Sequence, residues 1–164
     1  MIKEYIVDYY SPIGVIEIIG TDKAISSILF TEREFPVNRV NEKTPEVLKE
    51  CCKQLDEYFN GERLVFSFPY LIDGTEFQRN VWNELIAVPY AKTKSYKDMA
   101  ILIGNVKAVR AVGKANGKNK LSIVIPCHRI IGSNGELIGY AGGLWRKEWL
   151  LDHEQSVVSY STEL

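Results

Sequence analysis

Cysteine is scarce in this chain of 164 residues, and its three copies show no metal-binding or disulfide pattern. Cys51 and Cys52 are adjacent, and Cys127 stands alone far along the chain. Zinc sites built from cysteine need ligands in spaced pairs, typically with about two to four residues between them. The sequence therefore gives no support for a zinc site, and we expect neither a metal nor another cofactor.

Long apolar runs are also missing. No stretch approaches the length of about 20 residues that spans a bilayer, and the first residues lack the apolar segment of a signal peptide. We therefore expect a protein without membrane association, located in the cytoplasm (or the nucleus of a eukaryote), where its thiols stay reduced.

Charged residues are unevenly distributed, although the net charge is only −1. Residues 1–74 carry 8 lysines and arginines against 13 acidic residues, whereas residues 75–164 carry 12 against 8. The basic excess is strongest from Lys92 to Lys120, where eight basic residues accompany a single acid, Asp98. This distribution indicates a polyanionic partner for the C-terminal half, although a charge cluster can equally be a solvated surface.

The N-terminal half has the pattern of an antiparallel sheet. Three strand-like runs, separated by turn residues, occupy 4–10, 14–19 and 24–30. A further short strand is predicted at 64–69, and the following residues resemble a linker in which the sign of the charge changes. The predicted domains are therefore 1–74 and 75–164.

A helix is predicted between the third strand, at 24–30, and the fourth, at 64–69. Thr44 is its expected N-cap, Pro45 its first residue, and Gly61 follows its end. Cys51 and Cys52 fall on its apolar stripe, so we assign both to the core.

The C-terminal half is predicted to be mostly helical. Thr75 begins a helix with a capping box to Gln78, and Pro89 stops it. The buried face of this helix is predicted to consist of Phe77, Val81, Trp82, Leu85 and Ile86.

Two further short helices form a helix-turn-helix pattern. The first begins after its cap, Ser95, and reaches Ile103. Gly104 forms the turn, and Asn105 is expected to cap a second helix over 106–116.

The second of these helices is sorted into two faces. Its valines (Val106, Val109 and Val112) are predicted to lie towards one side. A positive face interleaved with small residues includes Lys107, Ala108, Arg110, Ala111 and Lys114. Small residues let a backbone approach a surface closely and cations contact phosphates, so we expect a nucleic-acid-binding face. The alternative is an ordinary amphipathic helix with solvated lysines.

The stretch from Leu121 to Ile131, LSIVIPCHRII, has the strongest chemical signal. Pro126 predicts a bend directly before Cys127. A thiol at a bend, between apolar walls and beside His128 and Arg129, is suited to forming an activated thiolate. The alternative is an inert, buried cysteine.

Glu154 is the candidate third member of this group. It falls on the apolar side of a helix predicted over 144–153, where a carboxylate needs a partner such as His128. Neighbours in extended backbone point to opposite faces, so we expect a water between Cys127 and the His128 ring. The competing base, His153, has no reactive neighbour in the sequence and is assigned a structural role.

Five ordered motifs resemble those of the O6-alkylguanine-DNA alkyltransferases (methylated-DNA–protein-cysteine methyltransferases). They are SYKDMA at 95–100, AVRAVGKANGKN at 108–119, IPCHRII at 125–131, GYAGGL at 139–144 and KEWLLDHE at 147–154. They lie within 75–154, about half of the chain. The resemblance implies an α/β (α+β) protein with a ribonuclease-H-like N-terminal sheet and helix, followed by a winged-helix-like domain containing the helix-turn-helix.

The same resemblance implies a suicide DNA-repair enzyme, expected to be a monomer, whose partner is double-stranded DNA containing alkylated bases. Cys127 is expected to take the alkyl group from an extruded O6-alkylguanine. His128 is expected to act through a water and Glu154 to orient it. Asn119 is expected to fix the active-site segment.

The remaining site residues follow from the resemblance and from the basic face. Tyr96 is expected to crowd a backbone phosphate and to act as a catalytic residue whose hydroxyl protonates or hydrogen-bonds the leaving base. Arg110 is expected to fill the gap that the base leaves. Further DNA contacts are expected from Lys107, Ala108, Ala111, Lys114 and Arg129. The wall of the alkyl pocket is expected to include Ser133, Tyr140, Gly142 and Gly143.

The sequence departs from the family pattern at Lys120, where proline is usual, so the hinge before the cysteine segment is expected to be looser and to carry one more cation near DNA. Two other functions remain open at this point. One is a turnover cysteine hydrolase or acyltransferase that uses Cys127, His128 and Glu154. The other is a damaged-DNA-binding module in which Cys127 is incidental.

Overall fold

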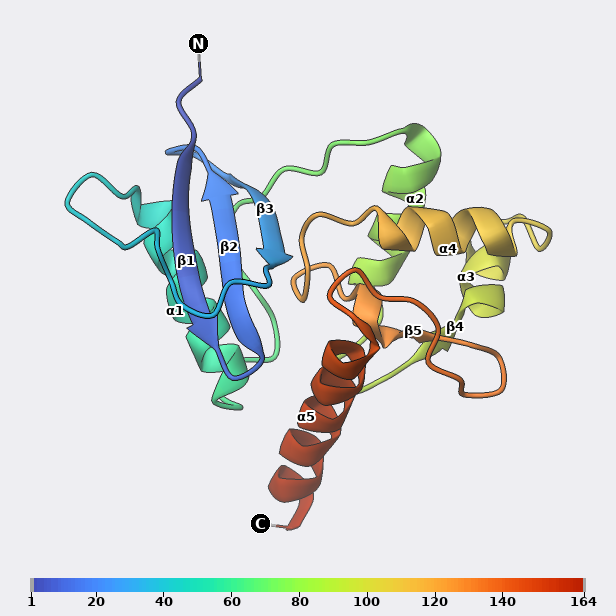
Figure 1. Cartoon of the computed structure of the whole chain (residues 1–164). Coiled ribbons are helices and arrows are strands. Elements are labelled where there is room, and N and C mark those ends of the chain that lie inside the picture. Colours follow the sequence, from blue (N-terminus) through green and yellow to red (C-terminus); the bar gives the residue numbers. More distant parts are fainter. Residues whose placement is uncertain (1, 164) are drawn as a thin grey trace. The chain divides into compact units, whose positions relative to one another are not determined.

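The computed structural model describes residues 2–163, the last three by their backbone alone. The chain divides into two compact units, one ending at Ile72 and the other beginning at Asp73 (Figure 1). The predicted boundary lies two residues further along the chain. Within the described range, no helix combines the length and apolar composition that crossing a lipid bilayer requires.

The first unit contains a three-stranded antiparallel sheet with β2 in the middle. Its strands are β1 (Tyr5–Ser11), β2 (Gly14–Gly20) and β3 (Ile25–Phe30). β1 pairs with β2 from Tyr5 opposite Gly20 to Ser11 opposite Gly14. The sheet forms because β-branched and aromatic residues make up most of these runs and a two-residue turn joins the first pair.

Helix α1 (Glu46–Phe59) packs on this sheet. Its N-cap is Pro45, one residue later than predicted, because the Thr44 hydroxyl accepts a hydrogen bond from a loop N–H three residues earlier (2.9 Å). Cys51 is fully buried and Cys52 is partly exposed. The assignment to the core is therefore confirmed for Cys51 and wrong for Cys52, which lies at the edge of the buried face.

The prediction of a strand at 64–69 is wrong. A single parallel bridge joins Ile25 to Tyr70, just beyond this segment. Within the segment, the Ser67 N–H donates to the side chain of Gln54 on α1 (2.9 Å). The Ser67 N–H is therefore satisfied by a helix side chain, and the Pro69 carbonyl at the end of the segment accepts from the Ile25 N–H of β3 (3.0 Å).

The Asp8 carboxylate on β1 is the main electrostatic anchor of the first unit. Its side chain is fully buried and accepts hydrogen bonds from the Arg33 guanidinium (2.6 and 3.0 Å) and from the backbone N–H groups of Val37 and Asn38 (2.8 Å each). Burial alone raises the pKa of Asp8, but these donors outweigh it and hold the pKa well below its ordinary value. One charge thus fixes the loop after β3 to the sheet.

Replacing Asp8 by asparagine is expected to lower the free energy of unfolding by about 2 kcal/mol at pH 7, because the charge-assisted bonds are lost. The Asp8 pKa is lower in the folded state, so its stabilisation is present at neutral pH and is lost as the pH falls below about 4. Urea denaturation at pH 7 and pH 3.5 measures this. Glu17→Gln is the control: Glu17 contacts the same Arg33 but is part exposed, and its loss is expected to cost less than about 0.5 kcal/mol. Equal losses in the two variants contradict the assignment.

The second unit is mostly helical. Its elements are α2 (Glu76–Ile86), β4 (Lys94–Ser95), α3 (Tyr96–Leu102), α4 (Val109–Gly117), the 3-10 helix η1 (Cys127–Arg129), β5 (Ile130–Ile131) and α5 (Leu144–Glu163). β4 and β5 form a short parallel pair, and α2, α3 and α4 pack together. The Trp82 indole on α2 donates to the Ala115 carbonyl on α4 (2.9 Å). Together the two units confirm the predicted mixed α/β class.

The start of α4 was predicted three residues too early. The Asn105 side chain accepts from the Lys107 N–H (3.2 Å), and its carbonyl accepts from the Ala108 N–H (3.0 Å). Asn105 therefore closes a turn before the helix. Val112 is fully buried, whereas Val106 and Val109 are exposed, so the predicted valine face is wrong for these two residues.

Two other helices also differ from prediction. The capping box of Thr75 and Gln78 on α2 is confirmed, but Ile86 is exposed and does not belong to the buried face. α5 continues ten residues beyond the predicted end at 153. No glycine or proline occurs after Gly143, so nothing in the local sequence breaks the helix.

Candidate active site

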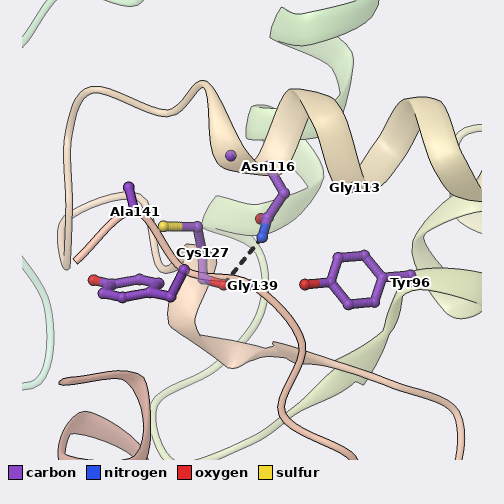
Figure 2. Close-up of a pocket in the computed structure, with 8 residues that line it drawn as sticks. Tyr96, Gly113, Asn116, Cys127, Gly139 and Ala141 are labelled. Atoms are coloured by element: carbon purple, nitrogen blue, oxygen red, sulfur yellow. Dashed lines mark hydrogen bonds between the residues drawn. The ribbon is translucent and has the colours of Figure 1, made fainter. Parts of the chain in front are cut away.

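A cavity of about 240 Å³ lies in the second unit (Figure 2). Its lining residues are Tyr96, Gly113, Asn116, Gly117, Cys127, Gly139, Tyr140 and Ala141. They come from α3, α4, η1 and the loop before α5. Cys127 is only 4% exposed, so this cavity is the route by which a ligand reaches its thiol.

A strained turn precedes Cys127. The Val124 N–H donates to the Ser122 carbonyl (2.8 Å), and Ile123 between them has φ +72°. This is a γ-turn with a β-branched residue in a region that favours glycine, and such a conformation costs free energy. The surrounding structure therefore imposes this path on the chain.

Asn119 supplies much of that constraint. Its side-chain N–H donates to the Ile125 carbonyl (2.9 Å), and its side-chain oxygen accepts from the Leu121 N–H (2.9 Å). A second tight turn follows, in which the Cys127 N–H donates to the Ile125 carbonyl (2.7 Å) across Pro126. Asn119 is thus placed to fix the active-site segment, although the neighbouring Lys120 replaces the usual proline.

His128 and Glu154 are brought together. The imidazole Nε2 lies 2.7 Å from Glu154 Oε2, and both side chains are fully buried. Cys127 and His128 lie on a 3-10 turn, where successive side chains diverge by about 120°, and not in the extended backbone that we assumed. No described residue provides a hydrogen-bond partner for the other ring nitrogen, Nδ1.

Glu154 has three more donors. The Arg129 guanidinium contacts both carboxylate oxygens (2.9 and 3.0 Å), and the Ala91 N–H donates to one of them (3.0 Å). Although burial raises the pKa of Glu154, the bonds from His128 and Arg129 outweigh it and lower the pKa. Glu154 is therefore ionised, and it accepts a hydrogen bond from the protonated Nε2 of His128.

These contacts define the protonation of the ring. Burial lowers the pKa of His128 more than Glu154 raises it, so the imidazole is neutral at pH 7. Because Nε2 carries the proton that Glu154 binds, Nδ1 has a free lone pair. Burial raises the pKa of the Cys127 thiol, while Asn119 and Lys147 partly offset this. The thiol thus needs a base, and Nδ1 of the adjacent residue is a suitable one.

Lys147 is a site residue that the sequence analysis missed. Its ammonium group donates to the carbonyls of Ile138 and Gly139 (3.0 and 3.1 Å) and lies 3.4 Å from the Tyr96 hydroxyl. Burial lowers its pKa to about 8, and Cys127 partly opposes this. Lys147 therefore holds the 138–139 loop, which forms one wall of the cavity. The sequence offered one signal for this residue: Lys147 is seven residues before Glu154 in the predicted helical region, a spacing that places both on the same face.

The expected DNA-contacting residues separate into two groups. Lys107, Arg110, Ala111 and Lys114 are exposed, and Tyr96 lies at the cavity. The prediction of DNA contact is corrected for Ala108 and Arg129, because both are buried. Ala108 is buried because it precedes α4 and closes the turn from Asn105. Arg129 is buried against Glu154 and also donates to the Val88 carbonyl (2.8 Å), so it has no side-chain surface to offer DNA.

The expected cavity wall needs a similar correction. Tyr140 lines the cavity, but Ser133, Gly142 and Gly143 do not. Ser133 is exposed in the turn after β5, where the Gly132 N–H bonds to the Glu136 carbonyl (2.7 Å). The Gly142 carbonyl accepts from Arg146 (2.9 Å) and anchors the start of α5. The described side chains include no group of three or more His, Cys, Asp or Glu residues placed to hold a metal ion.

Comparisons with known proteins find matches in both units. The family model "6-O-methylguanine DNA methyltransferase, DNA binding domain" matches residues 76–156, and "6-O-methylguanine DNA methyltransferase, ribonuclease-like domain" matches residues 5–72. The chain belongs to the 6-O-methylguanine DNA methyltransferase family.

Relatives resemble the chain over most of its length. Methylated-DNA–protein-cysteine methyltransferases from Methanosarcina acetivorans and Mycobacterium leprae are 43% and 41% identical, over 93% and 94% of this chain and 99% and 94% of theirs. The crystal structure of Mycobacterium tuberculosis O6-methylguanine methyltransferase is 36% identical and covers 94% of both chains, with a TM-score of 0.83. The crystal structure of the M. tuberculosis protein in complex with DNA is 38% identical and has a TM-score of 0.82, over 94% of this chain and 93% of that chain. The chain is therefore an enzyme of the methylated-DNA–protein-cysteine methyltransferase class, which acts in DNA repair.

Replacing Arg129 by methionine is expected to lower the free energy of unfolding by about 3 kcal/mol, because it leaves the buried Glu154 carboxylate with too few positive partners. Urea denaturation measures this. Arg110→Ala, at an exposed arginine, is the control and is expected to stay within about 0.5 kcal/mol of the parent. An Arg129 variant as stable as the control contradicts the structural role.

Proposed function

We propose that the chain removes the alkyl group from O6-alkylguanine in double-stranded DNA by a single, irreversible transfer to Cys127. The observation that supports this most directly is the placement of Cys127 at the cavity, followed by His128 whose Nε2 is bonded to Glu154 (2.7 Å). A neutral imidazole with a free Nδ1, on the residue that follows a buried thiol, can act as the base that generates the thiolate through a bridging water.

The proposed transfer is a displacement at carbon. The Cys127 proton passes, through a bridging water, to His128 Nδ1, and Glu154 stabilises the resulting imidazolium. The sulfur electron pair forms a bond to the alkyl carbon, the bond between that carbon and guanine O6 breaks, and O6 keeps the electron pair. Guanine then takes up the proton, so the products are intact guanine and an S-alkyl cysteine.

The transfer is single-turnover for a chemical reason. The product is a thioether, and a thioether offers water no good leaving group. Nothing in the proposed reaction regenerates the thiol, so each molecule reacts once.

The buried position of Cys127 implies extrusion of the target base. A guanine stacked in a duplex cannot bring its O6 substituent to a thiol that is 4% exposed. Rotating the nucleotide out of the stack into the cavity solves this problem. We expect the exposed residues of α4, above all Arg110, to contact the duplex and to occupy the vacated space.

The first test is stoichiometry. Duplex DNA carrying radiolabelled O6-methylguanine is expected to transfer about one label per protein molecule and then stop, because the thiol is consumed. Cys127→Ala is expected to abolish transfer. Cys52→Ala, at a part-exposed thiol in the other unit, is the control and is expected to keep it.

The outcomes separate the alternatives. Many equivalents of product per protein support a turnover hydrolase or acyltransferase. Binding of the modified duplex without any label on the protein supports a recognition module.

A second test concerns Arg110. Arg110→Ala is expected to slow repair of duplex DNA at least about tenfold, since the gap left by the extruded base is no longer filled. Its reaction with free O6-benzylguanine, which needs no extrusion, is expected to change less than about twofold. Arg39→Ala, an exposed arginine in the first unit, is the control. Rate measurements on both substrates decide this, and equal losses on both overturn the extrusion role of Arg110.

A further inference from the structure

Asn116 contributes an unused hydrogen-bond acceptor to the cavity. It lies near the end of α4, is 6% exposed and lines the cavity. Its side-chain N–H donates to the Cys127 carbonyl (3.3 Å). No described residue donates to its side-chain oxygen, Oδ1, although that atom is buried.

The orientation of this amide is fixed by its surroundings. Turning the amide over would place Oδ1 against the Cys127 carbonyl, and two acceptors would then face each other. A buried acceptor without a donor is unfavourable, and in a native protein it calls for an explanation. Figure 2 shows the Asn116 side chain reaching from α4 into the space between Cys127 and Tyr96, two other residues that line the cavity.

The neighbouring polar groups serve other contacts. The Tyr96 hydroxyl donates to the Ile138 carbonyl (2.7 Å), and the Lys147 ammonium group binds the same carbonyl. Both therefore hold the wall of the cavity in the form described. Asn116 differs from them: its amide nitrogen bonds to the Cys127 carbonyl and also interacts with the Tyr96 hydroxyl, where it partly offsets the burial that raises the pKa of that group, while its Oδ1 has no donor among the described residues.

The missing donor has a chemical match on the proposed substrate. An O6-alkylated guanine presents acceptors at N1, N3, N7 and O6, and the amino group at C2 is its one hydrogen-bond donor in the ring system. That amino group and O6 lie on the same edge of the base, on either side of N1. A base that turns its O6 side towards the Cys127 sulfur therefore carries the amino group along the same wall of the cavity.

We propose that Asn116 Oδ1 accepts a hydrogen bond from the 2-amino group of O6-alkylguanine and thereby makes Asn116 a specificity-determining residue of the cavity. This inference rests on the proposed function. It implies a preference for alkylated guanine over alkylated bases that lack this donor, such as O6-alkylhypoxanthine and O4-alkylthymine.

The test compares two bases that differ only in the amino group. Single-stranded oligonucleotides carrying O6-methylguanine or O6-methylhypoxanthine avoid any difference in base pairing. Single-turnover rates of methyl transfer to Cys127 are measured for the unmodified protein and two variants, and circular dichroism verifies their folding. The unmodified protein is expected to react about tenfold faster with the guanine, which is the scale of one satisfied hydrogen bond.

The two variants separate recognition from positioning. Asn116→Leu removes both the acceptor and the bond to the Cys127 carbonyl. It is expected to slow the guanine reaction about tenfold and the hypoxanthine reaction less than about threefold, so the preference disappears. Asn116→Asp keeps an acceptor but loses the bond to Cys127. It is expected to slow both reactions and to retain the preference for guanine.

Three results overturn the inference. The first is that the unmodified protein reacts with the two bases at equal rates. This result needs no variant; it leaves the proposed function intact and shows that Asn116 does not recognise the 2-amino group. Equal losses on both bases in Asn116→Leu assign Asn116 to positioning of Cys127 alone. Absence of transfer to Cys127 from O6-methylguanine in both the single-stranded oligonucleotide and a duplex overturns the proposed function itself, and this inference with it.

Discussion

The buried carboxylate of Glu154 constrains the second unit more than any other group. It has no contact with solvent, so its charge must be balanced inside the protein, and it binds His128, Arg129 and the Ala91 N–H. These partners come from η1 and from the loop before β4, whereas Glu154 lies on α5. One ionised group therefore fixes three segments and sets the proton position on the His128 ring. Catalytic orientation and local stability depend on the same contacts.

The segment around Cys127 is held by polar groups, although its sequence is apolar. Asn119 binds the backbone on both sides of a strained turn at Ile123, and Lys147 binds the loop that closes the cavity. An amide and an ammonium group can impose such geometry only because they are buried, where an unmade hydrogen bond is costly. The cavity thus has a preformed shape, which suits a reaction whose rate depends on placing a carbon atom opposite a sulfur.

Local sequence signals worked well where neighbouring residues decide the outcome. The capping boxes at Thr75 and Ser95 and the three strands of the first unit follow from short-range chemistry, and the structure contains them. They failed where a distant residue intervenes. Ser67 bonds to a side chain on α1, so no strand forms there, and the turn closed by Asn105 delays α4. Motifs alone also placed Arg129 on the DNA side, whereas its charge is required by Glu154.

The sequence by itself determined the class of fold, the division into two units, the family, and the pairing of His128 with Glu154, because periodicity, caps and ordered motifs are written along the chain. Only the tertiary structure decided which side chains meet at the cavity. It brought Asn116 to the cavity and Lys147 to the loop that forms its wall, and it removed Ser133 and Arg129 from the roles expected of them. The physical reason is that burial and hydrogen-bond satisfaction depend on residues far apart in the sequence, so no local pattern encodes which polar group is left with a free acceptor.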